Sequence, residues 1–204
     1  MKPHSPGRRN YQFIEVPNST FKDFGMKFCS QCGTPVRRLV PPGDTHERFV
    51  CAACQTIHYQ NPKIVAGCIP EWQDKILLCR RAIEPRLGLW TIPAGFMELN
   101  ETTAQAAARE ALEEANAVVE IGDLHTLYNL PHISQVYLVY RSQLRNLDYA
   151  PGQESLEVKL FGEDEIPWEQ MAFRAVTFAL QHFFADRRQG RYALHQGEHN
   201  ATQG

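Results

Sequence analysis

One stretch of the chain decides the predicted fold: GFMELNE at residues 95–101, then seven residues, then REALEE at residues 109–114. Between the two parts, Thr102 and Gln105 have the spacing of a capping box, in which each side chain satisfies a backbone N–H at the start of a helix. The stretch therefore predicts a glycine-led loop followed by a helix over residues 103–115.

Three carboxylates of this helix, Glu110, Glu113 and Glu114, stand at i, i+3 and i+4 and share one face. Like charges at this spacing destabilise an isolated helix, and a hard divalent cation such as Mg²⁺ or Mn²⁺ would offset the repulsion. The alternative is a solvated acidic face with Arg109 as a chance neighbour. We expect the opposite side of the helix to pack on a sheet through small apolar residues: Ala104, Ala108, Ala111, Leu112 and Ala115.

Two CxxC pairs precede this region, Cys29/Cys32 and Cys51/Cys54, with 18 residues between them. This spacing is typical of zinc sites in which four thiolates complete a tetrahedral shell. Because such a shell has no open position for a water, we expect a structural Zn²⁺. A nucleic-acid-reading ribbon and a redox CxxC motif are the alternatives.

The chain divides by its texture into a tail at residues 1–26, a zinc ribbon at 27–61 and a larger domain at 62–204. One hypothesis is that translation begins at Met26, and an intact mass of native protein starting at Met1 would rule it out. Strands are predicted at 64–69, 76–79, 124–130, 136–140 and 158–161, and a final amphipathic helix at about 168–186. Strands and helices mixed without strict alternation indicate an α/β or α+β sandwich.

Composition excludes several classes of protein. With 204 residues, 43% hydrophobic residues and a net charge of −2, the chain resembles an ordinary globular protein and lacks the basic footprint of non-specific nucleic-acid binders. No apolar run suggests a membrane span or a secretory signal, so we expect a soluble cytoplasmic protein. Cys68 and Cys79 lie in apolar strand candidates, and we expect them to be buried.

The glycine, glutamate and arginine spacing from Gly95 to Ala117 resembles the Nudix box. The chain departs from the box at Asn116, where the family has Gly, and at Ala111 and Ala117, where larger aliphatic residues are usual. Asn tolerates the left-handed conformation needed there. From residue 27 to about 199 the chain is similar to Nudix hydrolases with an N-terminal zinc ribbon, especially plant-type FAD pyrophosphatases that also cleave ADP-ribose. The matching stretches are CSQCG, YQNPKIVAGCIP, ILLCRRAIEPRLGLWTIPAGFMELNET, PGQESLEVKLF and DEIPW.

The resemblance implies an α/β/α sandwich with a mixed sheet and a hydrolase that uses Mg²⁺ or Mn²⁺. By the same resemblance, Glu110, Glu113, Glu114 and the Gly95 carbonyl hold the metal ions, which position a water for attack on phosphorus. Arg109 and Glu101 are expected to form an ion pair that supports the loop against the helix.

A further carboxylate, used as a metal ligand or base, is expected on a later loop. Glu154 fits best and Glu157 is the second choice, although the two can equally be an exposed pair before a strand. Arg81 and Arg86 are candidate phosphate contacts or surface charges. Four aromatic residues are candidates for a surface that stacks on adenine or flavin, although most aromatics near strands are core: Trp90, Phe96, Tyr128 and Tyr137.

Four histidines, His125, His132, His195 and His199, have no recognisable metal-ligand spacing, and the last ten residues, HQGEHNATQG, are expected to be a mobile tail and not a metal site.

The substrate is predicted to be a small dinucleotide or nucleotide sugar: FAD, cleaved to FMN and AMP, or ADP-ribose, cleaved to AMP and ribose 5-phosphate. The NADH pyrophosphatase branch carries a SQPWPFPxS-like segment, whereas this chain has LYNLPHISQVYLVY at 127–140, which disfavours NADH and NAD-linked RNA. The alternative from another class is a ribbon-guided nucleic-acid-binding protein. Dimers are common in the family, but no pattern of residues in this sequence indicates a dimer interface.

Overall fold

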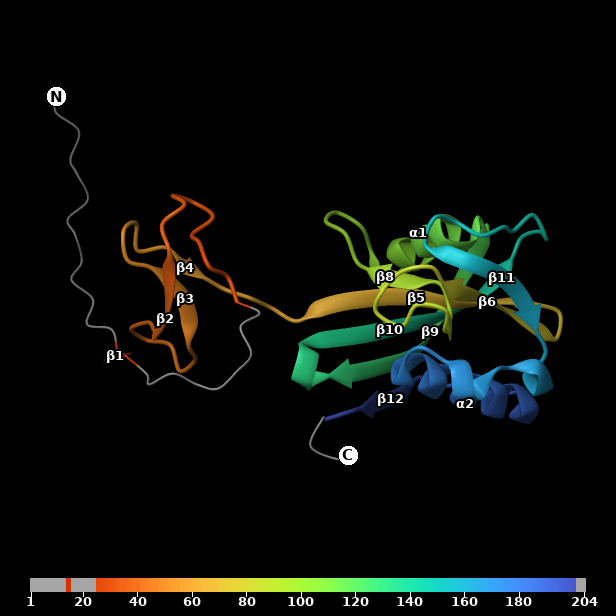
Figure 1. Cartoon of the computed structure of the whole chain (residues 1–204). Helices are drawn as coiled ribbons and strands as arrows, with labels where there is room; N and C mark the ends of the chain where they lie inside the picture. The colour runs from red at the N-terminus through yellow and green to blue at the C-terminus, as the bar shows by residue number, and fades with distance from the viewer. Residues whose placement is uncertain (1–13, 16–24, 201–204) are drawn as a thin grey trace, which may run out of the picture. The chain divides into compact units, whose positions relative to one another are not determined.

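The computed structural model describes residues 14–15 and 25–200, and the chain divides into two compact units between Asn61 and Pro62. We describe each unit by itself (Figure 1). The predicted tail at 1–26 lies almost entirely outside the described residues, as do the last four residues. Among the residues described, no helix is long and apolar enough to cross a membrane.

The first unit is a small antiparallel sheet in the order β1-β2-β3-β4. Its strands are β1 (Ile14–Glu15), β2 (Val36–Val40), β3 (Arg48–Cys51) and β4 (Ile57–His58). The two CxxC pairs form tight turns beside it. Gly33 has φ +71°, a conformation that glycine adopts without steric cost, and its N–H donates to the Cys29 carbonyl.

The second unit is a mixed sheet between two helices. Its main strand order is β11-β6-β5-β10-β9-β12, with β7 paired to β6 and β8 to β5. The pairs β5–β10 and β9–β12 are parallel and the others antiparallel. The strands are β5 (Lys63–Trp72), β6 (Lys75–Arg81), β7 (Trp90–Thr91), β8 (Ala94–Phe96), β9 (Val119–Leu130), β10 (Gln135–Leu144), β11 (Ser155–Phe161) and β12 (His195–Glu198).

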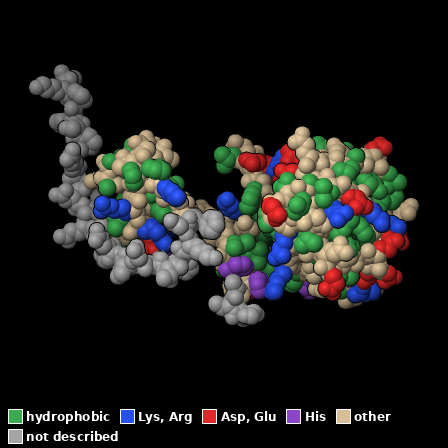
Figure 2. All heavy atoms as spheres, viewed as in Figure 1, with side chains coloured by type: hydrophobic (Ala, Val, Ile, Leu, Met, Phe, Trp, Pro, Cys, Tyr) green, Lys and Arg blue, Asp and Glu red, His purple; other side chains and the backbone are tan. Residues whose placement is uncertain are grey.

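The helices α1 (Thr103–Ala115) and α2 (Arg174–Gln189) cover opposite faces of this sheet (Figure 1). Short 3₁₀ turns lie at Pro131–Ile133, Glu163–Glu165 and Trp168–Gln170. The expected α/β sandwich with a mixed sheet is confirmed. Figure 2 shows acidic and basic side chains interspersed on the visible face of this unit, in keeping with the small net charge.

The two faces of the sheet have different cores. On the α2 side, large side chains such as Ile69, Phe183 and Phe184 form the main cluster. On the α1 side, Ala106, Ala107 and Ala111 pack on Ala66 and Cys68. Alanines at the contact let the helix axis approach the sheet closely, which brings the ends of the α1 side chains to the edge of β8. Cys68 and Cys79 are both buried, as expected.

The predicted helix over 103–115 is confirmed. The capping box between Thr102 and Gln105 forms in both directions, and Asn116 ends the helix in the left-handed conformation with φ 48°. All five predicted strands are present, each within a longer or equal observed strand.

Two details of the helix predictions were wrong. The final helix begins at Arg174 and not at Trp168, because Met171 and Ala172 instead pair with the backbone of Trp90. On α1, Leu112 is 52% exposed, and Ala104 and Ala108 are only partly buried. The buried residues of α1 are Ala106, Ala107, Glu110, Ala111, Glu114 and Ala115. Two of the three carboxylates therefore share the buried side of the helix.

Candidate active site

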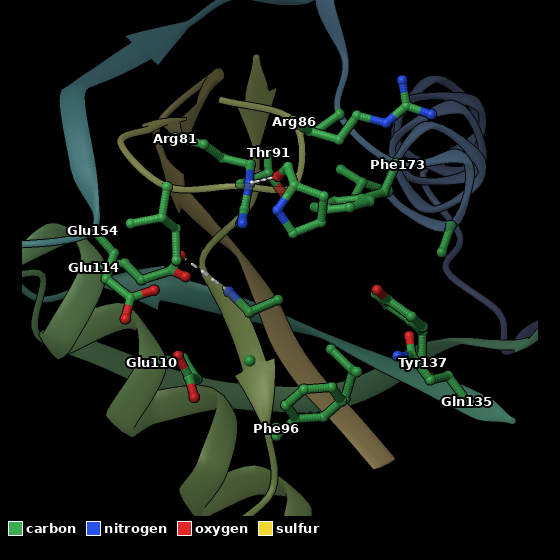
Figure 3. A pocket seen from close by; sticks show the side chains of 18 of the residues that line it. Arg81, Arg86, Thr91, Phe96, Glu110, Glu114, Gln135, Tyr137, Glu154 and Phe173 are labelled. Carbon is green, nitrogen blue, oxygen red and sulfur yellow. Dashed lines mark hydrogen bonds between the residues drawn. The ribbon is translucent and has the colours of Figure 1, made fainter. Parts of the chain in front are cut away.

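A wide cleft of about 1560 Å³ lies along α1 in the second unit. Its walls come from α1, β8, the loop after β6, the loop before β11, the turn before β10 and the start of α2. Figure 3 shows the side chains of Glu110, Glu114 and Glu154 on one side of this cleft, with Gln135 and Tyr137 at another. The cleft thus joins an acidic region to a partly aromatic one.

The acidic region consists of two buried glutamates and one more exposed neighbour. Glu110 is 8% exposed and Glu114 is 6% exposed, whereas Glu113 is exposed. Burial, followed by the charge of Glu110, raises the pKa of Glu114 to about 8. Burial also raises the pKa of Glu110, and the charge of Glu154 adds to the rise at both sites. Arg109 at Glu110 and Arg81 near Glu114 offset only part of this rise, and a divalent cation would supply further positive charge.

Two glycines bring backbone against this region. A Cβ at Gly95 would lie 2.3 Å from the Glu110 Oε1 atom, so a larger residue here would require the Glu110 carboxylate to move away from β8. A Cβ at Gly152 would lie 1.8 Å from the Glu113 carbonyl oxygen, and the Gly152 N–H donates to the Glu114 carbonyl at 2.9 Å. The loop that carries Glu154 is therefore fixed to the end of α1. Sequence reasoning missed Gly152, although a glycine two residues before a candidate ligand was a usable signal.

Arg109 connects the loop and the helix. It donates to both carboxylate oxygens of Glu101 at 2.9 and 3.0 Å, to Glu110 at 2.7 Å and to Glu113 at 2.9 Å. A further bond reaches the Phe96 carbonyl at 3.1 Å. The Arg109 guanidinium holds the pKa of Glu101 at about 2. This geometry is the supporting ion pair that the resemblance implies, and it orients Glu110 from behind.

The predicted phosphate contacts both line the cleft. Arg81 donates from Nε to the Pro85 carbonyl at 2.9 Å, and its guanidinium lies 5.1 Å from the ring centre of Phe173. The positive charge of Arg81 acts on both Glu114 and Tyr137, so it lies between the acidic and aromatic parts of the cleft. Arg86 lines the same wall.

The structure separates the two candidate carboxylates of the later loop. Glu154 lines the cleft, whereas Glu157 points out of it and lies 3.8 Å from Arg80 in an exposed ion pair. The second choice, Glu157, is thus not part of the cleft. The reason is register, because Glu157 already pairs with Arg80 in the β11–β6 ladder.

The four candidate aromatics also divide. Phe96 and Tyr137 line the cleft. Trp90 is buried edge-on against Phe161 at 4.9 Å, and Tyr128 is buried 4.9 Å from Phe178, so both are core residues. Phe173, just before α2, also lines the cleft. The pattern of the sequence did not single out Phe173, because its position depends on where α2 begins.

In the first unit, the four cysteines converge. Their Sγ atoms all lie within 4.8 Å of one another, and three of the six pairs, Cys29–Cys54, Cys32–Cys51 and Cys32–Cys54, are 3.4 to 3.6 Å apart. Thiolates bound to one zinc at about 2.3 Å in a tetrahedron are separated by about 3.8 Å, so the cluster fits the ion. The Thr56 hydroxyl, which hydrogen-bonds Cys54, holds the pKa of that thiol at about 6. All four residues are those predicted for the structural Zn²⁺.

The expectation of a mobile tail was wrong for part of the C-terminal segment. His195–Glu198 forms β12, which pairs in parallel with β9, and His195 contacts Asp186 of α2. His199 follows β12 and lies beside His132 at the rim of the cleft. The remaining residues of the predicted tail, 201–204, lie outside the described residues.

Comparisons with known proteins identify the family. A family model described as NUDIX domain matches residues 61–181, more than half of the chain. The chain belongs to the Nudix family. A second model, a zinc ribbon described as Nudix N-terminal, matches residues 27–60. The recognition of a Nudix domain with an N-terminal zinc ribbon is therefore confirmed.

A solved structure of a NUDIX hydrolase from Nitrosomonas europaea is similar to this Nudix protein along most of its length. The two chains are 59% identical with a TM-score of 0.83, and the match covers 86% of this chain and 99% of that chain. An ADP-ribose pyrophosphatase from Streptococcus suis 89-1591 has 20% identity and a TM-score of 0.54, covering 68% of this chain and 100% of that chain. At that identity the likeness shows the fold alone.

Curated relatives include proteins named NAD-capped RNA hydrolase NudC. The protein from Salmonella heidelberg (strain SL476) is 37% identical over 97 residues, which cover 46% of this chain and 35% of the relative. The protein from Salmonella schwarzengrund (strain CVM19633) is 30% identical over 145 residues, which cover 69% of this chain and 53% of the relative. The matches to this Nudix chain thus span about a third to a half of these relatives.

Proposed function

We propose that the protein is a hydrolase that uses Mg²⁺ or Mn²⁺ to split the diphosphate linkage of a nucleoside diphosphate joined to another group. One observation carries the proposal. Glu110, Glu114 and Glu154 line one part of the cleft, and the burial of Glu110 and Glu114 beside the charge of Glu154 favours a divalent cation there. Arg81 lies beside them as a positively charged partner for phosphate.

In the proposed reaction, the metal ions would be held by Glu110, Glu113, Glu114, Glu154 and the Gly95 carbonyl. Bound there, the ions would supply Lewis-acid chemistry, offsetting the charge of the phosphates and making a water more nucleophilic toward phosphorus. Arg109 donates hydrogen bonds to Glu101, Glu110 and Glu113 at the same time, and so keeps the carboxylates of Glu110 and Glu113 in place. Arg81, supported by the Phe173 ring, binds the phosphate oxygens from the aromatic side.

The proposed substrate is FAD or ADP-ribose. The cleft volume exceeds the roughly 300–1,000 Å³ of ordinary small-ligand pockets, which leaves room for a dinucleotide. Phe96 and Phe173 offer ring surfaces for a base, whereas Tyr137, which also lines the cleft, is only 9% exposed. We place the enzyme in the cytoplasm, where the reducing conditions keep the four zinc-binding cysteines as thiols.

A second candidate is hydrolysis of NAD-capped RNA, because the curated relatives carry that name. His132, Ile133 and Gln135 line the cleft, so the stretch in which this chain departs from the NADH branch lies where it can affect substrate choice. This departure favours FAD or ADP-ribose over an NAD-linked group.

The deciding experiment is parallel hydrolysis of FAD, ADP-ribose, NADH and an NAD-capped RNA by the full chain, with Mg²⁺ and with Mn²⁺. Products are resolved chromatographically, and Glu114→Gln reports background from contaminating phosphatases. The highest kcat/KM for FAD or ADP-ribose, with AMP as a product, supports the proposal. A clear preference for NADH or the capped RNA overturns the substrate, and equal product from wild type and Glu114→Gln overturns the reaction.

A further inference from the structure

A cluster of histidine and aspartate side chains lies in the second unit, outside the residues that line the main cleft. His125 comes from β9, Asp186 from α2 and His195 from β12. Their ligand atoms all lie within 4.8 Å of one another. His195 Nε2 is 2.8 Å from Asp186 Oδ2, and the ring centres of His125 and His195 are 5.3 Å apart. Three elements that are distant in sequence thus place three potential ligands together.

His125 is the observation that points to a ligand. It is 1% exposed, and neither of its ring nitrogens has a hydrogen-bond partner among the described residues. A buried polar group without a partner costs about 1–3 kcal/mol. The Ala179 carbonyl of α2 lies beside the ring without normal hydrogen-bond geometry. Metal-bound histidines often direct the second ring N–H to such a carbonyl while the first nitrogen holds the ion.

We propose that His125, Asp186 and His195 bind one Zn²⁺ ion. Two imidazole nitrogens and one carboxylate oxygen are a ligand set that zinc uses, with a fourth position for a water. A small cavity of about 240 Å³ lies against His125, one of the three proposed ligands. The ion would satisfy one of the two unpartnered nitrogens of His125 and replace the direct contact between His195 and Asp186.

The charged groups near the cluster include two arginines that share one carboxylate, Glu71. Arg141 lines the same cavity, but its guanidinium lies 3.2 Å from Glu71 and 3.3 Å from the ring centre of Tyr192. Arg187 lies 3.2 Å from the same Glu71 carboxylate. His182 stacks on His195, with the ring centres 4.1 Å apart, and is not one of the three proposed ligands. Within the cluster, Asp186 supplies the carboxylate that would offset part of the charge of a bound ion.

Zinc at this position would hold the end of the described chain to the sheet. The four residues of β12 pair with β9 from His195 opposite Thr126, and the next residue, His199, donates its N–H to the Asn129 carbonyl. His199 also lines the main cleft. A bound ion would therefore connect α2, β9 and β12 and stabilise one rim of the cleft without taking part in hydrolysis.

The test counts zinc in the full chain after equilibration with Zn²⁺, with Mg²⁺ in excess to occupy the carboxylate cluster. Three variants are compared with wild type. Asp186→Asn and His195→Gln each remove a ligand with little change in size, and His182→Gln changes the stacked neighbour as a matched control. Zinc is counted by elemental analysis after removal of free ion, and near-ultraviolet circular dichroism checks that each variant folds.

We expect wild type and His182→Gln to retain one more zinc per chain than Asp186→Asn and His195→Gln. The affinity at this site should fall by at least about 10–100-fold in the two ligand variants. Because the cysteine cluster is the same in all four proteins, the difference does not depend on its occupancy. Equal zinc in all four proteins overturns the proposal and leaves a hydrogen-bonded cluster without metal.

Thermal unfolding of the second unit provides a measurement that remains useful if one ligand variant is unstable. Added Zn²⁺ should raise the unfolding midpoint of wild type and of His182→Gln by the same amount, since a ligand that binds only the folded state stabilises it. It should leave the midpoint of Asp186→Asn unchanged. An equal rise in wild type and Asp186→Asn overturns the assignment to these residues.

Discussion

The four-cysteine cluster and the carboxylate cluster differ in how completely each encloses an ion. The cysteines supply four donors within 4.8 Å of one another in the small unit and leave no position for a water. Glu110 and Glu114 lie at the wall of a wide cleft in the larger unit. A closed set of ligands thus stabilises a fold, whereas an open set leaves coordination positions for water and substrate.

The two clusters also differ electrostatically. Hydrogen bonding with Thr56 lowers the pKa of Cys54 to about 6, which favours the thiolate that zinc binds, whereas burial and the hydrogen bond with Cys32 raise the pKa of Cys51 to about 11. Burial raises the pKa of Glu114 to about 8, which disfavours the carboxylate until a cation arrives. The closed cysteine cluster suits an ion that stays bound, and the open carboxylate cluster suits ions that exchange with solvent. Four predictions test this contrast, from the largest expected effect to the smallest.

The largest effect is expected from Cys51→Ser, which removes a buried zinc ligand. Structural zinc contributes on the order of 10 kcal/mol to the folding of small domains, so the first unit should lose its fold. Limited proteolysis should then cleave within residues 27–60, while the second unit stays intact because it has its own core. Cys79→Ala is the control and should retain the zinc. A resistant first unit in Cys51→Ser would contradict the closed-site interpretation.

The next effect is the loss of hydrolysis in Glu114→Gln. Metal ions supply several kcal/mol of transition-state stabilisation, and 1.36 kcal/mol corresponds to a factor of ten, so kcat/KM should fall by roughly 10²–10³-fold. The measurement is initial rates with saturating Mg²⁺, with circular dichroism to show that the fold is unchanged. Activity near that of wild type would remove Glu114 from the set of metal ligands.

A matched pair of variants sharpens the outline of the open site. Glu154→Gln should reduce kcat by about 10-fold or more, because Glu154 faces the cleft. Glu157→Gln should have almost no effect, since Glu157 is in an exposed ion pair with Arg80, and such pairs contribute about 0–1 kcal/mol. Both are measured under one set of conditions. Equal losses in the two variants would argue against a specific role of Glu154.

The smallest effect concerns stability without added Mg²⁺ or Mn²⁺. Since the folded pKa of Glu114 is raised from 4.5 to about 8, the folded state binds the proton more tightly than the unfolded state. Stability should therefore fall as pH rises from about 4.5 to 8. Glu114→Gln removes this dependence and should be more stable than wild type at pH 8 by about 1–3 kcal/mol. Chemical denaturation at pH 5 and pH 8 measures it, and a larger deficit of the variant at pH 8 would contradict it.

The sequence predicted the local parts of the molecule well. The capping box and Asn116 set the bounds of α1 through contacts within the helix itself, and the CxxC pairs form their own turns. These features depend on residues a few positions apart, so spacing alone determines them. The family resemblance then extended this local information to the mixed sheet.

Features that depend on long-range pairing were not predictable in the same way. Met171 leaves the expected helix because it pairs with Trp90, and Glu157 leaves the cleft because of its register opposite Arg80. His125 and Asp186 are 61 positions apart and meet only after β9 and α2 pack together. Nothing in their spacing indicates this contact, since the packing of whole elements produces it.

Hydrogen bonds attach residues 150–152 to the end of α1. Ala150 and Gly152 donate N–H groups to the carbonyls of Ala115 and Glu114, and the Asn116 amide donates to the Ala150 carbonyl at 3.0 Å. A glycine in place of Asn116 would have no such side-chain bond. Because this attachment sets the position of Glu154, an insertion among the exposed residues 146–148 should leave the geometry of the acidic site unchanged.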